Sequence, residues 1–339
     1  MRTLKKIVVV LCVLVLILIQ SCTKESSIKG LKQFIELPVS KLPIYAVAIS
    51  NSHKLIAVME RHTLQVYQNR NGQYAILLSK ELPGIYCPSS LFLDESKERV
   101  ILIDNQLPIY KHNRWIKGDN SFLFGEEYIN AYIAYNISFN GEMEIINLND
   151  PYISHFNKNY ESDKFQLRDS LLYYQYSPVI NMKEFPRQES VTNLSPPDKK
   201  IFYSENIIEH DLQSNSKKVI YNHLSDLQTN YIQSFDIDQN HIVLLKTEGK
   251  VFMYDLPMNQ PIQEWSVTPD VTDLIILDQN TLLLKDQKYY YLFKEGQKLE
   301  KIVPVSWRLI KTNSAVFFIK PISIEDDKIQ IFKMNWQEQ

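Results

Sequence analysis

Short apolar runs alternate with polar turns along most of the chain, and one combination recurs. Each unit has a short strand pattern that ends at an aromatic or histidine side chain and is followed by polar turn residues. Seven segments share this pattern: 63–67, 107–110, 152–156, 207–210, 251–254, 289–293 and 328–332. Their last residues lie 43, 46, 54, 44, 39 and 39 positions apart. Such regular spacing predicts a repeat architecture.

A second apolar run precedes each segment where a neighbouring strand is expected. These runs cover residues 54–59, 99–103, 143–148, 201–203, 241–245, 281–284 and 315–319. We expect them to be buried inner strands. Units of about 44 residues with four short strands are typical of β-propeller blades. The sequence therefore predicts an all-β propeller of seven four-stranded blades, with six or eight blades as alternatives and a two-sheet β-sandwich as the competing fold.

The two ends of the repeat suggest how the ring closes. The last unit stops soon after Phe332 without an outer strand, whereas residues 31–37 form an extra strand pattern ahead of the first unit. Pairing this N-terminal strand into the last blade removes two open sheet edges. We therefore expect residues 31–339 to form a single propeller domain closed by its N-terminal strand.

The sequence Asp-Gln-Asn occurs at 238–240 and again at 278–280, an offset of 40 that fits a duplicated turn. Asp236, Asp238 and Asn240 also have the alternating oxygen ligands of a calcium loop. The glycine and the closing glutamate that such a loop needs are missing. The pattern therefore favours a turn over a cation site.

Residues 1–21 have the layout of an export signal. Arg2, Lys5 and Lys6 precede an apolar run at 7–19, and these 13 residues are fewer than the roughly 20 needed to span a bilayer. The run leads directly into Ile-Gln-Ser-Cys, which ends at Cys22. The alternative is an uncleaved signal anchor in which Cys22 is incidental.

These four residues resemble the lipobox of bacterial lipoproteins. The resemblance implies cleavage before Cys22, diacylglyceryl attachment to its thiol, and acylation of the new amino terminus, for example with palmitate. Thr23, in place of Asp, resembles lipoproteins sent to the outer membrane. We expect a cleaved signal peptide at 1–21, a lipidated tether at 22–30, and a protein held in the bacterial cell envelope, with the periplasmic and surface sides left open.

Charge and cysteine content narrow the function classes. Without residues 1–21, which hold three cations and no carboxylate, 34 Lys and Arg face 39 Asp and Glu, a net charge of −5. This acidic balance argues against a nucleic-acid partner. Cys87 is the one cysteine left beside Cys22, so we expect no disulfide within the domain and a stability that depends on the core.

One unit resembles a known blade family. Residues 249–256, Gly-Lys-Val-Phe-Met-Tyr-Asp-Leu, resemble the third strand of a WD-type blade, with Tyr254 at the tryptophan position. The other units lack the Gly-His and Trp-Asp pairs of that family, so the resemblance covers one strand.

The longest unit is interrupted by residues 178–198, which are rich in proline and polar side chains. Prolines argue against a regular strand, so this segment is predicted to be an inserted loop. Such loops often carry binding specificity, although simple length variation is the favoured explanation.

Familiar catalytic and cofactor motifs are missing. The chain contains no Gly-x-Ser-x-Gly elbow, His-Glu-x-x-His helix, Cys-x-x-Cys pair or phosphate-binding glycine loop. We therefore assign no catalytic, cofactor-binding or metal-binding residue and expect no cofactor. Cys22, as a lipidation site, is the single site residue predicted.

Histidines and tyrosines are better explained by packing. The histidines are spread over the predicted blades, which favours packing or surface roles over a shared metal site: His53, His62, His112, His155, His210, His223 and His241. Tyrosine-rich segments at 173–176 and 289–291 offer stacking faces for a sugar. Alternate rings of a strand point to opposite faces, so packing between blades is favoured.

These observations favour an envelope lipoprotein that acts as a non-enzymatic binding or scaffold module for a protein or glycan partner. The alternative is a polysaccharide-active lyase or hydrolase, whose carboxylates would gather at the mouth of the propeller channel. An outer-membrane assembly factor is a third hypothesis, based on architecture alone.

Overall fold

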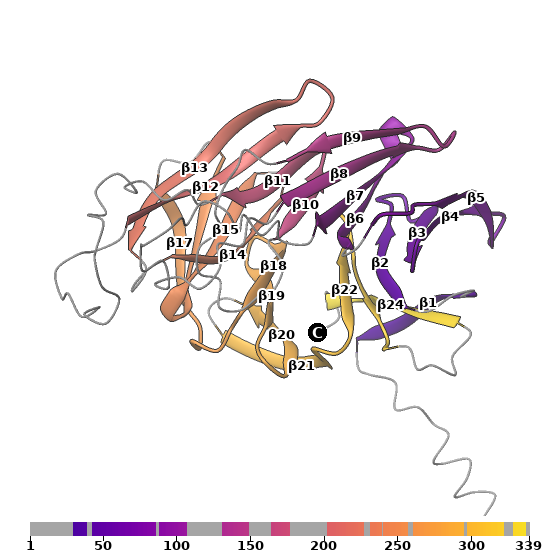
Figure 1. The fold of residues 1–339 in the computed structure, drawn as a ribbon. Coiled ribbons are helices and arrows are strands. Elements are labelled where there is room, and N and C mark those ends of the chain that lie inside the picture. The colour runs from indigo at the N-terminus through magenta and orange to yellow at the C-terminus, as the bar shows by residue number, and fades with distance from the viewer. Residues whose placement is uncertain are drawn as a thin grey trace, which may run out of the picture.

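The structure is a computed structural model that describes residues 30–38, 43–85, 88–106, 131–148, 164–176, 202–226, 231–238, 240–256, 260–294, 297–321 and 328–336. Its strands form six antiparallel sheets of four strands each, arranged as the blades of a β-propeller (Figure 1). The prediction of seven blades is therefore wrong in number, and the fold is a six-bladed propeller.

The strands of each blade follow from the innermost to the outermost. Blade 1 contains β2 (Ile44–Ile49), β3 (Leu55–Glu60), β4 (Thr63–Arg70) and β5 (Gln73–Glu81). Blade 2 contains β6 (Pro88–Asp94), β7 (Arg99–Gln106), β8 (Ala131–Ser138) and β9 (Met143–Asn147). Blade 3 contains β10 (Phe165–Arg168), β11 (Leu171–Tyr176), β12 (Phe202–Asp211) and β13 (Ser216–Asp226).

The other half of the ring is built in the same way. Blade 4 contains β14 (Ile232–Ile237), β15 (His241–Lys246), β16 (Lys250–Asp255) and β17 (Pro261–Ser266). Blade 5 contains β18 (Asp273–Asp278), β19 (Thr281–Lys285), β20 (Tyr289–Lys294) and β21 (Gln297–Pro304). Blade 6 contains β22 (Arg308–Lys311), β23 (Val316–Ile319), β24 (Lys328–Met334) and β1 (Leu31–Pro38).

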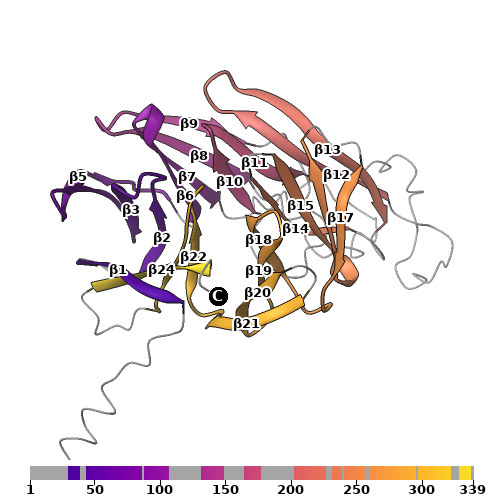
Figure 2. The same ribbon diagram turned by 180° about the vertical axis from the view of Figure 1, so that it is seen from behind.

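The N-terminal strand closes the ring, as the sequence predicts. β1 pairs antiparallel with β24, with Leu31 opposite Met334 and Pro38 opposite Lys328. The indigo β1 and the yellow β24 lie side by side from both directions of view (Figures 1 and 2). Leu37 of β1 is 1% exposed and packs into the core between blades 6 and 1. The strand is thus an integral part of the last blade.

The error in blade number arose in the stretch between blades 1 and 3. The third strands of blades 1, 3, 4, 5 and 6 coincide with predicted repeat segments, but the third strand of blade 2 is β8. The segments predicted at 107–110 and 152–156 lie outside the described residues. Between β4 and β12 there is thus one blade where the apparent spacing indicated two.

Two of the predicted inner runs were also assigned to the wrong strand. Residues 143–148 largely form β9, the outermost strand of blade 2, and residues 202–203 begin β12, a third strand. The second strand of blade 3 is β11 instead. The other five runs match second strands. One of them, β3, is buried along its whole length, as expected for a strand that is covered on both sides.

The hydrophobic core is divided into layers between neighbouring blades. Among the described residues, six separate clusters of buried side chains occur, one at each of the six interfaces around the ring. β3 shows how one strand serves two layers: Ile56 and Val58 face blade 6, whereas Ala57 and Met59 face blade 2. Successive side chains of a strand point to opposite faces. Continuous apolar runs therefore fit the second strands, which are covered on both sides.

The two faces of the ring differ in what they carry. Each innermost strand turns into its second strand on one face, where the described connecting residues are 50–54, 95–98, 169–170, 238 and 240, 279–280 and 312–315. Gly30 lies at the same face, because Asn335 N donates to Gly30 O and Met334 pairs with Val316. We call it the tether face, and the opposite side the far face.

Several predicted features lie outside the described residues: the segments 1–21 and 22–29, Cys22, Cys87, the inserted loop at 178–198, and the histidines His112 and His155. No helix in the described part of the chain is long and apolar enough to cross a membrane.

Candidate functional site at the central channel

Polar side chains cross between the innermost strands of blades 3 to 6. On β14, Phe235 and Ile237 pack into the core toward blade 3, so Ser234 and Asp236 point to the other side, toward blade 5. The polar face of β14 therefore places hydrogen-bonding groups between the innermost strands of neighbouring blades. Two clusters of such groups follow.

The first cluster is centred on Lys164, which directly precedes β10 of blade 3. Its Nζ lies 2.7 Å from Asp273 Oδ1 and 2.6 Å from Leu274 O, both in blade 5. The same Nζ lies 3.3 Å from Ser234 Oγ of blade 4, and Ser234 also donates to Asp273. One lysine therefore links three consecutive blades.

This arrangement keeps Asp273 ionised. Burial by itself would raise the pKa of the Asp273 carboxyl, but the charge of Lys164 and the hydrogen bonds from Lys164, Ser234 and the Leu274 N–H outweigh it. The pKa of Asp273 therefore lies below its ordinary value.

The second cluster lies nearer the tether face. The side chain of Asp236 is 1% exposed, and its Oδ2 accepts a hydrogen bond from Ile276 N of blade 5 at 2.6 Å. The same oxygen forms an ion pair with Lys311 of β22, in blade 6. Asp236 thus joins blades 4, 5 and 6 in the way that Lys164 joins blades 3, 4 and 5.

Two further side chains, Gln166 and Arg308, complete the links between innermost strands. Gln166 of β10 donates to Phe235 O and accepts from Ile237 N, both at 3.1 Å, which fastens blade 3 to blade 4. Arg308 Nη1 of β22 donates to Tyr45 O of β2 at 2.8 Å, between the last blade and the first. The innermost strands are therefore joined by side chains as well as by core packing.

The carboxylates of these two clusters are held in ion pairs. Glycoside cleavage requires one carboxylic acid with a raised pKa and one ionised carboxylate. Within the described residues, the two carboxylates of the channel, Asp236 and Asp273, each hold a lysine, and the pKa of Asp273 is lowered. Asp273 therefore lacks the raised pKa that a proton donor needs.

A row of hydrogen bonds also ties neighbouring turns on the tether face. Asn313 N donates to Asn51 Oδ1 at 2.9 Å, and Ser52 Oγ donates to Glu95 Oε1 at 2.6 Å. Farther along, the hydroxyls of Ser96 and Ser170 lie 3.3 Å apart. These bonds connect blades 6, 1, 2 and 3 in sequence.

Blades 2 and 3 are joined in addition by a buried arginine. Arg99 Nε donates to Asp94 Oδ2 at 2.9 Å, and both side chains are less than a tenth exposed. Arg99 Nη2 also donates to Ser170 O of blade 3 at 3.5 Å. The charge of Asp94 is thus compensated beside the blade interface.

The repeated Asp-Gln-Asn turn is confirmed. Asn240 N donates to Asp238 Oδ1 at 2.8 Å, and Asn280 N donates to Asp278 Oδ1 at 3.0 Å. Asp238 also accepts from the backbone and ring of His241, whereas Asp236 points to Lys311. The oxygens of the calcium-like pattern therefore face different partners, and no group of three metal-binding side chains occurs in the described part of the chain.

The described histidines lie in separate places. His53 packs against Phe317 of blade 6, with ring centroids 5.1 Å apart, and burial lowers its pKa. His210 is fully buried in blade 3 and bonds to Asn215 Oδ1 at 2.9 Å. His241 contacts the Asp238 carboxylate in blade 4. These positions agree with packing and turn roles.

The tyrosine-rich strands pack between blades as the alternation predicts. Tyr173 faces blade 4 and Tyr174 faces blade 2, while Tyr290 faces blade 6 and Tyr291 faces blade 4. Burial, followed by the hydrogen bond to Glu209, raises the pKa of Tyr173. These rings are not available as a platform for a sugar.

No family model matches the chain, and no curated protein matches it. Solved structures that resemble it include BamB from Moraxella catarrhalis, at 10% identity and a TM-score of 0.44, covering 90% of this chain and 100% of that one. Sqt1 from Saccharomyces cerevisiae has 11% identity and a TM-score of 0.42, covering 89% and 98%. The computationally designed Ika8 protein has 9% identity and a TM-score of 0.47, covering 89% and 100%. Likenesses this distant say nothing about function.

Proposed function

We propose that the protein is anchored in the bacterial cell envelope by lipid on Cys22, at the outer membrane, and acts there as a non-enzymatic binding module for a protein or glycan partner. The position of β1 carries this proposal. The strand that follows the predicted tether is the outer strand of blade 6 and begins at the tether face. A lipid on Cys22 would therefore be attached to the propeller itself, through a short segment.

The length of that segment limits how far the propeller can lie from the membrane. Gly30 lies eight positions after Cys22, and an extended chain spans at most about 28 Å over eight positions. A propeller held this closely presents its tether face or its blade 6 rim to the lipid. In either orientation the far face does not lie against the membrane and is available to a partner.

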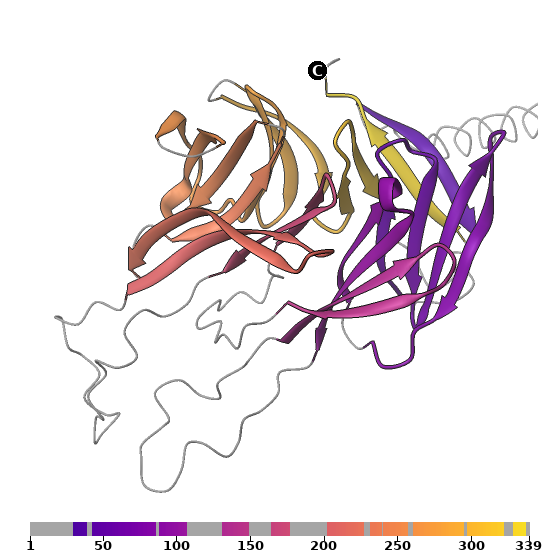
Figure 3. The ribbon, with the colours of Figure 1, turned by 90° about the horizontal axis from the view of Figure 1, so that it is seen from above.

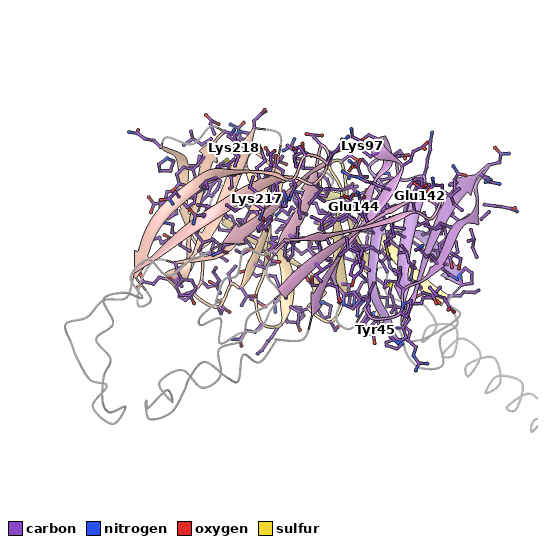
Figure 4. The ribbon with its side chains drawn as sticks, turned by 45° about the horizontal axis from the view of Figure 1, so that its top comes forward. Tyr45, Lys97, Glu142, Glu144, Lys217 and Lys218 are labelled. Atoms are coloured by element: carbon purple, nitrogen blue, oxygen red, sulfur yellow. The ribbon has the colours of Figure 1, made fainter. Side chains whose placement is uncertain are left out.

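The far face offers side chains of the kind that interfaces use. Tyr45, near the far-face end of β2, and Tyr231, just before β14, are each 36% exposed. Figure 4 shows Tyr45 at the side of the molecule opposite to the labelled charged residues. Tyrosine is enriched at protein interfaces and also stacks on sugars. These residues support binding without choosing between the two kinds of partner.

The anchor is tested by replacing Cys22. In the bacterial cell, the wild-type chain should incorporate labelled palmitate and sediment with membranes, whereas Cys22→Ser should lose the label. Cys87→Ser is the matched control and should keep it. Labelling of Cys22→Ser at the wild-type level would refute the anchor.

The binding role is tested by affinity capture from detergent-solubilised envelopes with the full lipidated chain. One specific protein or glycan should be recovered, and Tyr45→Ala should recover less of it. Ile262→Ala, on the outer rim of blade 4, is the control that should recover it normally. Repeated capture without any specific component would count against the binding role.

A further inference from the structure

The far-face end of β22, the innermost strand of blade 6, carries an exposed arginine. Blade 6, drawn in yellow, lies between the indigo blade 1 and the orange blade 5 (Figure 3). Arg308 opens β22 and lies on the same face of the strand as Ile310, which packs into the layer between blades 6 and 1. Its side chain therefore points toward blade 1, where Nη1 donates to Tyr45 O at 2.8 Å.

Arg308 differs from the other cations on or beside the innermost strands. Each of those is paired with an aspartate: Lys164 with Asp273, Lys311 with Asp236, and Arg168 with Asp169. Within the described residues, Arg308 makes the hydrogen bond to Tyr45 O and no ion pair. Desolvation by the surrounding protein lowers the pKa of Arg308, and no carboxylate of the described residues raises it again. The other N–H groups of its guanidinium are available to a partner.

Tyr45 stands at a β-bulge of the innermost strand of blade 1. The pairing of β2 with β3 shifts between Ile44 and Ala46, so Tyr45 is the extra residue of β2. A bulge interrupts the ladder and changes the direction of the side chain there. Tyr45 is 36% exposed on the far face (Figure 4). The bulge thus gives Arg308 a carbonyl that holds it next to an exposed tyrosine.

Trp307 adds a second aromatic residue at this place. It directly precedes Arg308 in the far-face connection from β21 to β22 and is partly buried against Phe332, with ring centroids 5.3 Å apart. Tryptophan, tyrosine and arginine are the side chains enriched at the hot spots of protein interfaces. We call Tyr45, Trp307 and Arg308 the far-face cluster.

The charge of the far-face cluster suits a protein partner better than a glycan. An acidic glycan carries a repeated series of carboxylates and needs several cations, whereas a neutral glycan needs none. Arg308 is the one cation of the cluster, and the net charge of −5 without residues 1–21 opposes a polyanion. One arginine between two aromatic residues matches one acidic side chain set among apolar contacts.

We propose that the far-face cluster binds an aspartate or glutamate side chain of a protein partner, with Tyr45 and Trp307 in apolar contact beside it. The inference rests on the proposed function and selects protein from its two kinds of partner. Arg308 donates through its remaining N–H groups to both carboxylate oxygens. The bond to Tyr45 O holds the guanidinium in place before binding, which reduces the entropy lost on recognition.

Site-specific photo-cross-linking of the full chain in the bacterial cell tests this contact. A benzophenone amino acid in place of Ser306, which is exposed next to Trp307, should give one dominant protein adduct. The same group in place of Gln279, exposed on the tether face, is the positional control and should not give that adduct. A glycan adduct at Ser306, no adduct there, or the same adduct from both positions would overturn the inference.

Charge variants test the role of Arg308 in that adduct. Arg308→Gln keeps an N–H group for Tyr45 O but removes the charge, and should lower the adduct yield about tenfold. Arg308→Glu should abolish the adduct, whereas Arg308→Lys keeps the charge without the planar fork and should give an intermediate yield. Arg70→Glu, exposed at the tether-face end of β4, makes the same charge change and should leave the yield unchanged. Thermal unfolding checks that each variant retains the fold, and a yield that ignores Arg308→Glu would overturn the inference.

Affinity capture with the same variants separates this inference from the binding role. Loss of the captured protein in Arg308→Glu, but not in Arg70→Glu, is the expected result. A specific protein that Arg308→Glu still captures at the wild-type level would bind elsewhere, so the inference would fail while the binding role stands. Absence of any partner in both capture and cross-linking would refute the two together.

Discussion

Lys164 and Asp273 lie 2.7 Å apart, Nζ to Oδ1, although a whole blade stands between their two blades. Asp236 and Lys311 repeat the relationship one blade farther on. Each ion pair spans three blades and therefore resists separation of neighbouring sheets. The innermost strands carry these links at the place where the blades come closest together.

Removing either lysine should destabilise the propeller. Lys311→Met leaves the buried carboxylate of Asp236 without its cation and should lower the free energy of unfolding by about 2–4 kcal/mol. Lys164→Met should lower it by about 1–2 kcal/mol, because Asp273 keeps other donors and is partly exposed to water. Urea unfolding of purified variants measures both.

The exposed ion pair of Lys250 with Glu264 is the control for these variants. Lys250→Met should change the free energy of unfolding by less than about 0.5 kcal/mol. An equal loss of unfolding free energy in all three variants would show that the place of Lys164 and Lys311 between the innermost strands does not matter for stability.

Closure by β1 predicts that Leu37 is important for the stability of the whole ring. Leu37→Ala removes a side chain that is 1% exposed in the layer between blades 6 and 1. It should cost about 2–4 kcal/mol in free energy of unfolding. Lys32→Ala, exposed on the same strand, should cost under about 0.5 kcal/mol. A harmless Leu37→Ala would mean that β1 contributes little to closure.

Gly249 is required by a close backbone contact. Its φ is +73°, and a Cβ atom placed there would lie 2.2 Å from Val267 O. Gly249→Ala should therefore cost more than about 3 kcal/mol. Gly72 has a φ of +88° but no atom within 4 Å of such a Cβ, so Gly72→Ala should cost only about 1 kcal/mol. Thermal unfolding of the two variants separates the effect of the clash from the effect of the positive φ. Equal losses of stability in the two variants would contradict the clash at Gly249.

Stability should fall as the pH drops from 7 to 5, partly because of His53. Burial lowers the pKa of His53, so the folded state binds its proton less readily than the unfolded state does. Its stabilising contribution is complete above the ordinary histidine pKa of about 6.5 and is lost as the pH falls through the lowered value.

His53→Phe should reduce this pH dependence while keeping the ring contacts with Phe34 and Phe317. His62→Gln, at an exposed position, should leave the dependence unchanged. Urea unfolding at both pH values measures the slope, and an unaltered slope in His53→Phe would rule out this role.

The sequence predicts the elements whose partners are near in the chain. The Asp238 turn, the second strand at 241–245 and the third strand at 251–254 all fall in blade 4 as expected, because turn chemistry and apolar periodicity are local properties. The closing strand was also predicted, since an unmatched strand at each end of a repeat leaves few other solutions. Lipidation of Cys22 stays a prediction.

The number of blades and the ion pairs between the innermost strands could not be predicted from local sequence patterns. A spacing near 44 residues does not by itself show that a segment is a strand. The segments at 107–110 and 152–156 were nevertheless counted as strands, because they fitted this spacing. The partners in the channel are 109 residues apart for Lys164 and Asp273, and 75 for Lys311 and Asp236. No local sequence feature indicates which lysine pairs with which aspartate, so these ion pairs are visible only in the folded structure.

The pairing of β1 with β24 also orders events during synthesis. A chain that emerges from the amino terminus exposes β1 first and β24 last, so β1 must wait unpaired while the other five blades form. Contacts between residues this far apart in sequence form slowly. Until they form, β1 and β23 each present an open edge that invites pairing with other chains. A newly made propeller is thus vulnerable until its final strand arrives, and a chain cut short before residue 328 would never leave that state.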